Sequence, residues 1–351
     1  MKPIDNAIAM MADELTEWRQ WLHQRPELGY AEFEAQKFIA GKLREFGVDE
    51  VVEGIGGTGV VGLLHGAGGP ASGPEQRVMI RADMDALPMS EETGLDYASQ
   101  TEGQMHACGH DGHMTMLLGA AKHLAGKRNF NGSVVLCFQP AEEGGAGAKK
   151  MIEDGLFDRF DVRAVYGMHN WPGAGLGQFA AVPGPVMASA DEFYIDVVGK
   201  GGHAAQPHDA HDPIIAAAQI VLGLQTIVSR VVDPLQPAVL SVTIIQGGTT
   251  HNVIPGTVRL GGTVRTFDTA VHEQIYAEME RKCTQIAEAS HCTATIDRVD
   301  TAYPPTVNDP VQTAFAADVL DEVVGAENVI RSAPPVMGAE DFAYFAQEKP
   351  G

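Results

Sequence analysis

Cysteine and basic residues are scarce in this sequence. Its 351 residues include four cysteines, too few and too scattered for a disulfide framework, at Cys108, Cys137, Cys283 and Cys292. We therefore expect a reducing compartment, the cytoplasm. Lysine and arginine number 24 against 46 aspartates and glutamates, for a formal net charge of -22. Because no basic stripe exists to neutralise phosphates, we expect no nucleic-acid partner.

Long apolar runs are absent as well. The N-terminal residues 1–15 alternate polar and apolar side chains and lack a basic region followed by an apolar run, so we expect no signal peptide. No stretch of roughly 18 apolar residues is present, so we expect no membrane span. The hydrophobic share of 44% and the charged share of 20% are typical of a globular protein. The length favours two domains.

The first half of the chain alternates helical and strand patterns. Amphipathic spacing predicts helices over residues 5–25, 31–46, 113–124 and 148–153. Short apolar runs predict strands at 51–52, 59–64, 78–81, 133–138 and 164–168. This alternation predicts an α/β domain with a mostly parallel sheet over residues 1–185.

The pattern changes after the proline-rich segment 182–185. Residues 186–301 read as strand, helix, strand, strand, helix and strand, the ferredoxin-like βαββαβ order of an α+β domain. A second proline-rich segment, Ala302-Tyr303-Pro304-Pro305, closes this unit. We therefore predict an inserted domain at 186–301 and the second part of the first domain at 302–351.

A cluster of potential metal ligands lies at His106-Ala-Cys108-Gly-His110-Asp111-Gly-His113. Cysteine, histidine and carboxylate side chains all bind zinc-like metals, and the intervening glycines leave the backbone free to direct them inward. The alternative interpretation is a histidine-rich surface turn.

A pair of carboxylates, Glu142 and Glu143, follows the apolar strand at 133–138. Adjacent carboxylates repel each other unless a cation or a shared proton relieves them. One of them can bind a metal while the other moves protons. A solvated loop is the simpler alternative for this pair.

Two further strand ends carry candidate residues. His169 follows the strand at 164–168, and Asp83 and Asp85 follow the strand at 78–81. Parallel α/β sheets place their sites at strand ends. A lone histidine is more often structural, and the aspartates could equally bind a metal, orient a histidine or cap a turn.

Taken together, these motifs resemble the metal-dependent aminoacylase, carboxypeptidase and hippurate-hydrolase superfamily. The resemblance runs in order through Arg81–Pro88, His106–His113, Gln139–Gly145, Gly167–Asn170, Gly199–His208, His251–Phe267 and Met337–Phe342. The Cys-Gly-His form of the first cluster is similar to the branch of hippurate hydrolases and indole-acetyl-amino-acid hydrolases. The fold that this resemblance implies is a two-metal hydrolase domain with an inserted ferredoxin-like domain.

The resemblance also implies a site. Cys108, His110, Glu143 and His169 are the implied ligands of two divalent ions (zinc, manganese, cobalt or nickel), with the thiolate shared between the ions. Glu142 is the implied general base. In the same interpretation Asp111 and His113 are supporting or structural residues, and His106 has no assigned role.

The inserted domain contributes residues by the same resemblance. His203 is the implied lid histidine, which stabilises the oxyanion in the partner subunit of a homodimer. Asn252 and Arg265 are implied to hold the substrate carboxylate. Glu340, like Asp83 and Asp85, is implied to support the metal shell.

One element of the family pattern has no counterpart here. The family carries a last histidine ligand several tens of residues beyond the Glu-Asp-Phe element, whereas residues 343–351 contain no histidine. We therefore expect a C-terminally truncated chain with one metal position short of a ligand. The implied activity is hydrolysis of the amide bond of N-acyl-L-amino acids, such as hippurate. A dipeptidase, or a metal-binding chain without activity, remains the alternative.

Overall fold

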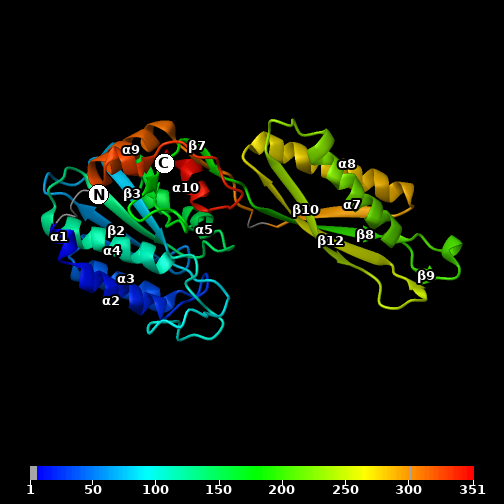
Figure 1. The fold of residues 1–351 in the computed structure, drawn as a ribbon, viewed down its shortest axis with the longest axis horizontal. Helices are drawn as coiled ribbons and strands as arrows, with labels where there is room; N and C mark the ends of the chain where they lie inside the picture. Colours follow the sequence, from blue (N-terminus) through cyan, green and yellow to red (C-terminus); the bar gives the residue numbers. More distant parts are fainter. Residues whose placement is uncertain (1–5, 300–301) are drawn as a thin grey trace. The chain divides into compact units, whose positions relative to one another are not determined.

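The computed structural model describes residues 6–299 and 302–351. The predicted start of the first helix at residue 5 and the predicted end of the inserted domain at residue 301 lie outside these residues. Contacts divide the chain into two units, each drawn in Figure 1. The first contains residues up to Gly184 with Val307–Pro334 and Asp341–Gly351, and the second contains Pro185–Thr306 and Pro335–Glu340.

The first unit alternates strands with helices, as its sequence pattern predicts. Its helices are α1 (Asn6–Ala9), α2 (Ala12–His23), α3 (Phe33–Glu45), α4 (His110–Lys127), α5 (Gly147–Glu153), α6 (Leu156–Arg159), α9 (Pro310–Val324) and α10 (Phe342–Glu348). Its strands are β1 (Glu50–Ile55), β2 (Gly59–His65), β3 (Arg77–Asp83), β4 (Ser133–Gln139), β5 (Ala164–Gly167), β6 (Phe179–Ala180) and β15 (Val329–Ile330). Two more strands, β7 (Gly184–Met187) and β14 (Thr306–Asn308), span chain boundaries between the units.

The main sheet has five strands in the order β1-β2-β4-β3-β5. The pairs β1/β2 and β2/β4 are antiparallel, whereas β3/β4 and β3/β5 are parallel. The α/β class is therefore confirmed, with a sheet that is mixed. Its parallel half contains β3, β4 and β5, so the carboxyl ends of these three strands meet at one edge.

Strand β4 connects two hydrophobic cores. All seven of its residues are buried, and successive side chains point to opposite faces of the sheet. Val134, Leu136 and Phe138 pack in the core with α2, α3 and α4, while Val135 and Cys137 pack in the core with α5 and α10. Helices thus cover both faces of this sheet (Figure 1), which explains the continuous apolar run in the sequence.

Some local features of the first unit differ from the sequence prediction. The predicted helix over 5–25 is interrupted, because a turn at Met10 and Met11 separates α1 from α2. Helix α9 was not predicted, although its start carries two ordinary signals. The Asp309 side chain accepts hydrogen bonds from the backbone N–H of Val311 and Gln312, and Pro310 occupies the first helical position.

The second unit has the predicted ferredoxin-like fold. Its helices are α7 (Pro213–Arg230) and α8 (Thr269–Ala289), and its strands are β8 (Asp191–Val198), β9 (Gly202–His203), β10 (Ala238–Gln246), β11 (Val253–Ile254), β12 (Thr257–Thr266) and β13 (Thr293–Arg298). The four long strands form an antiparallel sheet in the order β10-β12-β8-β13. Phe193, Ile195 and Val197 of β8 pack against both helices, and burial alternates along this strand.

Helix α7 is the most apolar long helix of the second unit. It is the one helix among the described residues that is long and apolar enough to cross a membrane, and a third (33%) of that stretch is buried. One such helix is weak evidence for a span, because core helices pass the same test. Ala216, Ile220, Leu224 and Ile227 pack in the core of the second unit.

Residues 335–340 group with the second unit, whereas the sequence interpretation placed them in the second part of the first domain. The backbone explains this difference. Ala188 donates its N–H to the carbonyls of Val336 (3.1 Å) and Gly338 (2.9 Å), and Val336 donates to Val186 (3.0 Å). These bonds hold the segment beside residues 186–188.

Candidate metal centre and active site

The predicted ligands of the first unit gather at the carboxyl ends of the parallel strands. Asp83 ends β3, the turn with Glu142 and Glu143 follows β4, and His169 follows β5. His110 opens α4 at the same place. The register of the parallel strands, in which Asp83 pairs with Gln139, brings these segments together. Four segments far apart in the sequence therefore converge on one site.

Two groups of potential metal-donor atoms overlap at the strand ends. Asp83, His110, His113 and His169 make one, and Cys108, His110 and Glu143 make the other, with the donor atoms of each group within 4.8 Å of one another. Cys108 Sγ lies 3.4 Å from His169 Nε2. His110 belongs to both groups, as expected for a residue between two cation positions.

Unpaired buried atoms indicate that these residues fit a metal. Both ring nitrogens of His110 and Oε1 of Glu143 are buried and have no hydrogen-bond partner among the described residues. A buried polar atom without a partner costs about 1–3 kcal/mol. A divalent ion would satisfy Nε2 of His110 and Oε1 of Glu143, whereas Nδ1 of His110 faces Asp85. The mixture of thiolate, imidazole and carboxylate suits zinc-like metals.

The glycine between Cys108 and His110 has a specific conformation. Gly109 has φ +94° and caps the start of α4. A Cβ at this position would lie 2.3 Å from Oδ1 of Asn170. Only glycine fits at this position. Its two neighbours, Cys108 and His110, are both potential metal ligands.

The charges around His110 favour a cation. Burial would raise the pKa of Asp83, but the Arg81 guanidinium, His110 and His113 hold it well below its usual range. Burial would lower the pKa of His110, but the carboxylates of Asp83 and Asp85 raise it. Burial raises the pKa of Glu143. This excess of carboxylate around one imidazole is the arrangement that a positive ion stabilises.

A buried network of hydrogen bonds centred on Arg81 fixes the side chain of Asp83. Arg81 donates to Asp83 Oδ2 (2.5 Å), to Gln139 Oε1 (2.7 Å) and to Asp341 Oδ1 (3.1 Å). The backbone N–H of Asp341 lies 3.4 Å from Oε1 of Glu142 and donates to it. Asp341 thereby connects Arg81 with the predicted base. The sequence interpretation named its neighbour Glu340 and missed Asp341, although two adjacent carboxylates were a visible signal.

Asp85 contacts both the histidine and the carboxylate pair. Its Oδ1 lies 3.4 Å from His110 Nδ1. Its two oxygens accept the backbone N–H groups of Glu142 (3.0 Å) and Glu143 (2.8 Å). Asp85 therefore connects the segment of His110 with the turn after β4, and its support of a metal shell stays a prediction.

His113 and Asp111 have different surroundings. His113 lies between Asp83 Oδ1 (2.7 Å) and Asn170 Oδ1 (2.5 Å), and its ring is 4.6 Å from that of His169. His113 belongs to the donor group by distance, but both of its ring nitrogens already contact these partners, so its supporting or structural role stays a prediction. Asp111 instead binds His23 Nδ1 (2.8 Å) and Arg19 Nε (2.7 Å) from α2.

His106 remains outside the donor groups. Its side chain is buried, and burial lowers the pKa of His106 to about 4. The ring is therefore neutral at physiological pH, and it lies 6.5 Å from the ring of His23. No chemical role follows from this position.

The predicted residues of the second unit are more exposed. His203 on β9 pairs with Val253 on β11, and Ala204 donates to the carbonyl of Asn252 (3.0 Å). His203 and Asn252 therefore lie on one small ribbon. Arg265, on β12, is half-buried and donates to the carbonyl of Met337 (3.4 Å). Glu340 is buried and groups with this unit, so its predicted support of the metal shell stays a prediction.

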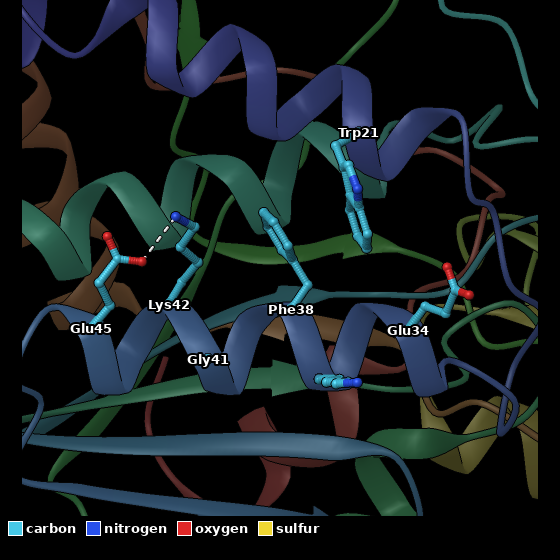
Figure 2. A pocket seen from close by; sticks show the side chains of 7 residues that line it. Trp21, Glu34, Phe38, Gly41, Lys42 and Glu45 are labelled. Atoms are coloured by element: carbon cyan, nitrogen blue, oxygen red, sulfur yellow. Dashed lines mark hydrogen bonds and ion pairs between the residues drawn. The ribbon is translucent and has the colours of Figure 1, made fainter.

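A groove between α2 and α3 lies apart from the strand ends. Figure 2 shows Trp21 and Phe38 facing each other across it, with their rings stacked at 4.4 Å, and Lys42 paired with Glu45 at 3.0 Å. Its other lining residues are Glu34, Lys37 and Gly41. None of them belongs to the predicted site.

The donor groups and the adjacent carboxylate pair define a class of protein, the metal-dependent hydrolases. Comparison with known families is consistent with this class. The family described as Peptidase family M20/M25/M40 matches this chain over residues 79–351. The chain belongs to this family and is a metal-dependent amidohydrolase or peptidase.

Individual relatives extend the similarity over nearly the whole chain. Hippurate hydrolase of Campylobacter jejuni is 43% identical over 336 residues, which cover 96% of this chain and 86% of that protein. N-acetyl-L-cysteine deacetylase of Bacillus subtilis is 44% identical over 346 residues, 98% of this chain and 80% of that protein. The structure of the Bacillus subtilis YXEP protein, described as a dinuclear metal-binding peptidase of the M20 family, has a TM-score of 0.81 and 34% identity, covering 99% of this chain and 88% of that one.

Proposed function

We propose that this protein hydrolyses the amide bond of N-acyl-L-amino acids, releasing a carboxylic acid and a free amino acid. The observation that carries the proposal is the turn after β4, which places Glu142 and Glu143 beside the buried donor groups. The relatives named hippurate hydrolase and N-acetyl-L-cysteine deacetylase support this substrate class.

Cys108, His110, Glu143 and His169 would hold two divalent ions in this proposal. The thiolate favours zinc, manganese, cobalt or nickel over magnesium. When bound, such ions supply the positive charge that polarises an amide carbonyl and acidifies water.

Glu142 would carry the proton in this reaction. Its buried carboxylate takes a proton from the attacking water and returns it to the amide nitrogen as the C–N bond breaks and the water oxygen joins the acyl carbon. The hydrogen bond from the Asp341 N–H to Oε1 fixes one oxygen of this carboxylate.

Three residues of the second unit would bind the substrate. His203 stabilises the developing oxyanion, and Asn252 and Arg265 hold the carboxylate of the amino acid, Arg265 through two parallel N–H donors. We propose that His203 serves the site of a partner subunit in a homodimer formed through the second unit. Strand β10, at one edge of the sheet, with Ile245 exposed, is the kind of surface that such a dimer covers.

We propose the cytoplasm as the compartment. All four cysteines are free, as a reducing environment requires. To test this proposal, the protein is extracted from cells in the presence of a thiol-blocking reagent, and the fraction of free cysteines is measured. Oxidised cysteines would contradict the proposal.

The function is tested with purified protein supplied with divalent metal. Benzoylglycine, N-acetyl amino acids and a dipeptide panel are assayed for release of free amino acid. Turnover of the N-acyl substrates supports the proposal, whereas turnover of dipeptides alone identifies a dipeptidase. Metal-loaded protein that cleaves neither class would contradict an enzymatic role for this chain.

The base is tested with Glu142→Gln, which keeps the size of the side chain and removes its basicity. We expect kcat to fall by about 10²–10⁴-fold with metal content unchanged. Wild-type turnover with the metal still bound would rule out Glu142 as the base.

A further inference from the structure

The turn that presents Glu142 and Glu143 is held in a conformation that its sequence does not favour. Ala141 has φ +51° and Ala146 has φ +53°, in the left-handed region that residues other than glycine rarely adopt. Such a residue costs about 1–2 kcal/mol. The turn therefore needs support from other parts of the chain.

Two buried carboxylates supply part of this support. Three consecutive N–H groups of the turn donate to them. Asp85 accepts from Glu142 and Glu143, and Oε1 of Glu32 accepts from Ala141 at 2.8 Å. Asp85 also contacts the predicted ligand His110, whereas Glu32 lies on the separate loop between α2 and α3.

Glu32 is fully buried, at 0% exposure, and makes a second contact. The hydroxyl of Thr58, itself buried, donates to its other oxygen. Burial raises the pKa of Glu32. A carboxylate kept at such a position requires its two donors, so the Ala141 N–H and the Thr58 hydroxyl fix its orientation.

Tyr30 forms a hydrogen bond with the other end of the turn. Its hydroxyl donates to the carbonyl of Gly145 at 2.6 Å. Burial raises the pKa of Tyr30 to about 12, so the phenol stays a donor at physiological pH. Tyr30 itself has φ +64°, another left-handed residue directed at the same turn.

Two glycines allow the segments to approach so closely. A Cβ on Gly29 would lie 2.9 Å from Cβ of Ala141, and a Cβ on Gly145 would lie 3.1 Å from the ring of Tyr30. Residues 29–32 and 141–145 are therefore packed backbone against backbone, with no room for larger side chains.

We propose that Glu32 and Tyr30 are positioning residues for Glu142, holding the turn after β4 together with Asp85. The proposal rests on the proposed function for the role of Glu142, and extends it to a loop without candidate ligands. Displacement of a catalytic group by about 1 Å costs about 100-fold in rate. Loss of an anchor on the turn therefore lowers kcat with little change in KM.

The chain offers a matched control on the same loop. Glu27 accepts hydrogen bonds from Glu34 N (3.0 Å) and Ala35 N (2.9 Å) at the start of α3. Its side chain is thus a helix anchor that does not touch the turn. Glu27→Ala loses this cap and some stability, but should leave kcat unchanged.

The test compares Glu32→Ala, Glu32→Gln and Glu27→Ala, each with its metal content measured. For Glu32→Ala we expect kcat to fall about 100-fold, with KM within about twofold of wild type. Glu32→Gln should restore most of the activity, because its amide oxygen still accepts the Ala141 N–H and the Thr58 hydroxyl can turn to accept. Equal kcat losses in Glu27→Ala and Glu32→Ala would overturn the proposal, as would a folded Glu32→Ala protein with wild-type kcat.

Hydrogen exchange provides a readout that needs no substrate. The peptide containing residues 139–147 should exchange faster in Glu32→Ala and as in wild type in Glu27→Ala. Unchanged exchange in Glu32→Ala overturns the positioning role. If the wild-type protein cleaves no N-acyl amino acid, the proposed function fails while this measurement still decides the anchoring.

Tyr30→Phe keeps the test decisive if Glu32→Ala does not fold. It removes one hydroxyl, and we expect about a 10-fold loss of kcat at unchanged KM, the loss for one charge-free hydrogen bond. Faster exchange of residues 139–147 should accompany this loss. A Tyr30→Phe protein with wild-type kcat and wild-type hydrogen exchange would overturn the proposal for Tyr30. If Glu32→Ala is also unfolded, this result would overturn the whole proposal.

Discussion

The two units place their candidate residues in different surroundings. In the first unit Asp83, His110 and Glu142 are buried, and Asp83 and Glu142 are held by charged or backbone partners. In the second unit His203 and Asn252 are exposed on a two-stranded ribbon. The first arrangement is preorganised, because its geometry exists before any ligand binds. The second leaves its groups exposed to solvent.

Ion pairs show the same difference. Arg81 and Asp83 are both buried, and Arg81 also pairs with Asp341 whereas Asp83 also pairs with His113. Arg259 and Asp196 in the second unit form an equally well-aligned pair at 2.6 and 2.7 Å, but their side chains are 52% and 41% exposed. The energetic weight of an ion pair therefore has to be judged from burial as well as geometry.

Among the variants that test this comparison, Asp83→Ala is expected to lower the free energy of unfolding the most. Removing one partner of a buried pair leaves the other charge uncompensated, which costs about 3–5 kcal/mol. Urea unfolding of the metal-free protein should show this loss in the free energy of unfolding. A loss below about 1 kcal/mol would mean that Asp341 alone compensates Arg81.

His203→Ala should act on catalysis and leave stability intact. We expect kcat to fall by about 10²–10³-fold, the loss for one oxyanion donor, with metal content and melting temperature unchanged. His208→Ala on the same exposed segment is the matched control. Equal kcat values for the His203→Ala, His208→Ala and wild-type proteins would remove His203 from the site.

Asp196→Ala is the counterpart of Asp83→Ala in the second unit. Because water screens the exposed pair, we expect a loss of about 0–1 kcal/mol in the free energy of unfolding. The same urea titration measures it. A loss comparable to that of Asp83→Ala would break the contrast between the two units.

The smallest effect is a pH dependence in the second unit. Burial would lower the pKa of His272, but the carboxylate of Asp191, 2.8 Å away, and Glu273 raise it above its ordinary value of 6.5. A raised pKa contributes stability that is fully present below 6.5 and is lost as the pH rises through the folded-state value. Unfolding measured across this window should show a decline that His272→Gln lacks. An identical decline in the variant would assign it to another group.

The fold and the strand-end residues could be predicted from the sequence, each from its own signal. Periodicity is a local signal, so the ferredoxin-like order of β8, α7, β10, β12, α8 and β13 could be read directly. Residues at the ends of parallel strands converge by geometry, so Asp83, Glu143 and His169 could be grouped without coordinates. The family resemblance then supplied roles that periodicity alone does not carry.

The supporting residues could not be predicted in this way. Asp341 reaches Gln139 across 202 positions, and Glu32 reaches Ala141 across 109. Glu32 lies outside the motifs of the sequence analysis, and Asp341 lies inside the Met337–Phe342 motif, where only Glu340 was given a role. Contacts of this kind depend on the packing of loops. His23, which binds Asp111 from α2, was hidden for the same reason inside an ordinary amphipathic pattern.

The glycine between Cys108 and His110 links the backbone conformation of the motif to the positions of more distant side chains. Any side chain there would collide with Asn170, which contacts His113, which in turn contacts Asp83. A single methyl group at residue 109 would therefore disturb Asn170 and, through it, His113 and Asp83 of the donor group, while leaving every donor in the sequence. Such a variant would retain each recognisable ligand and lose the geometry, so the presence of the motif residues alone does not identify a working member of this family.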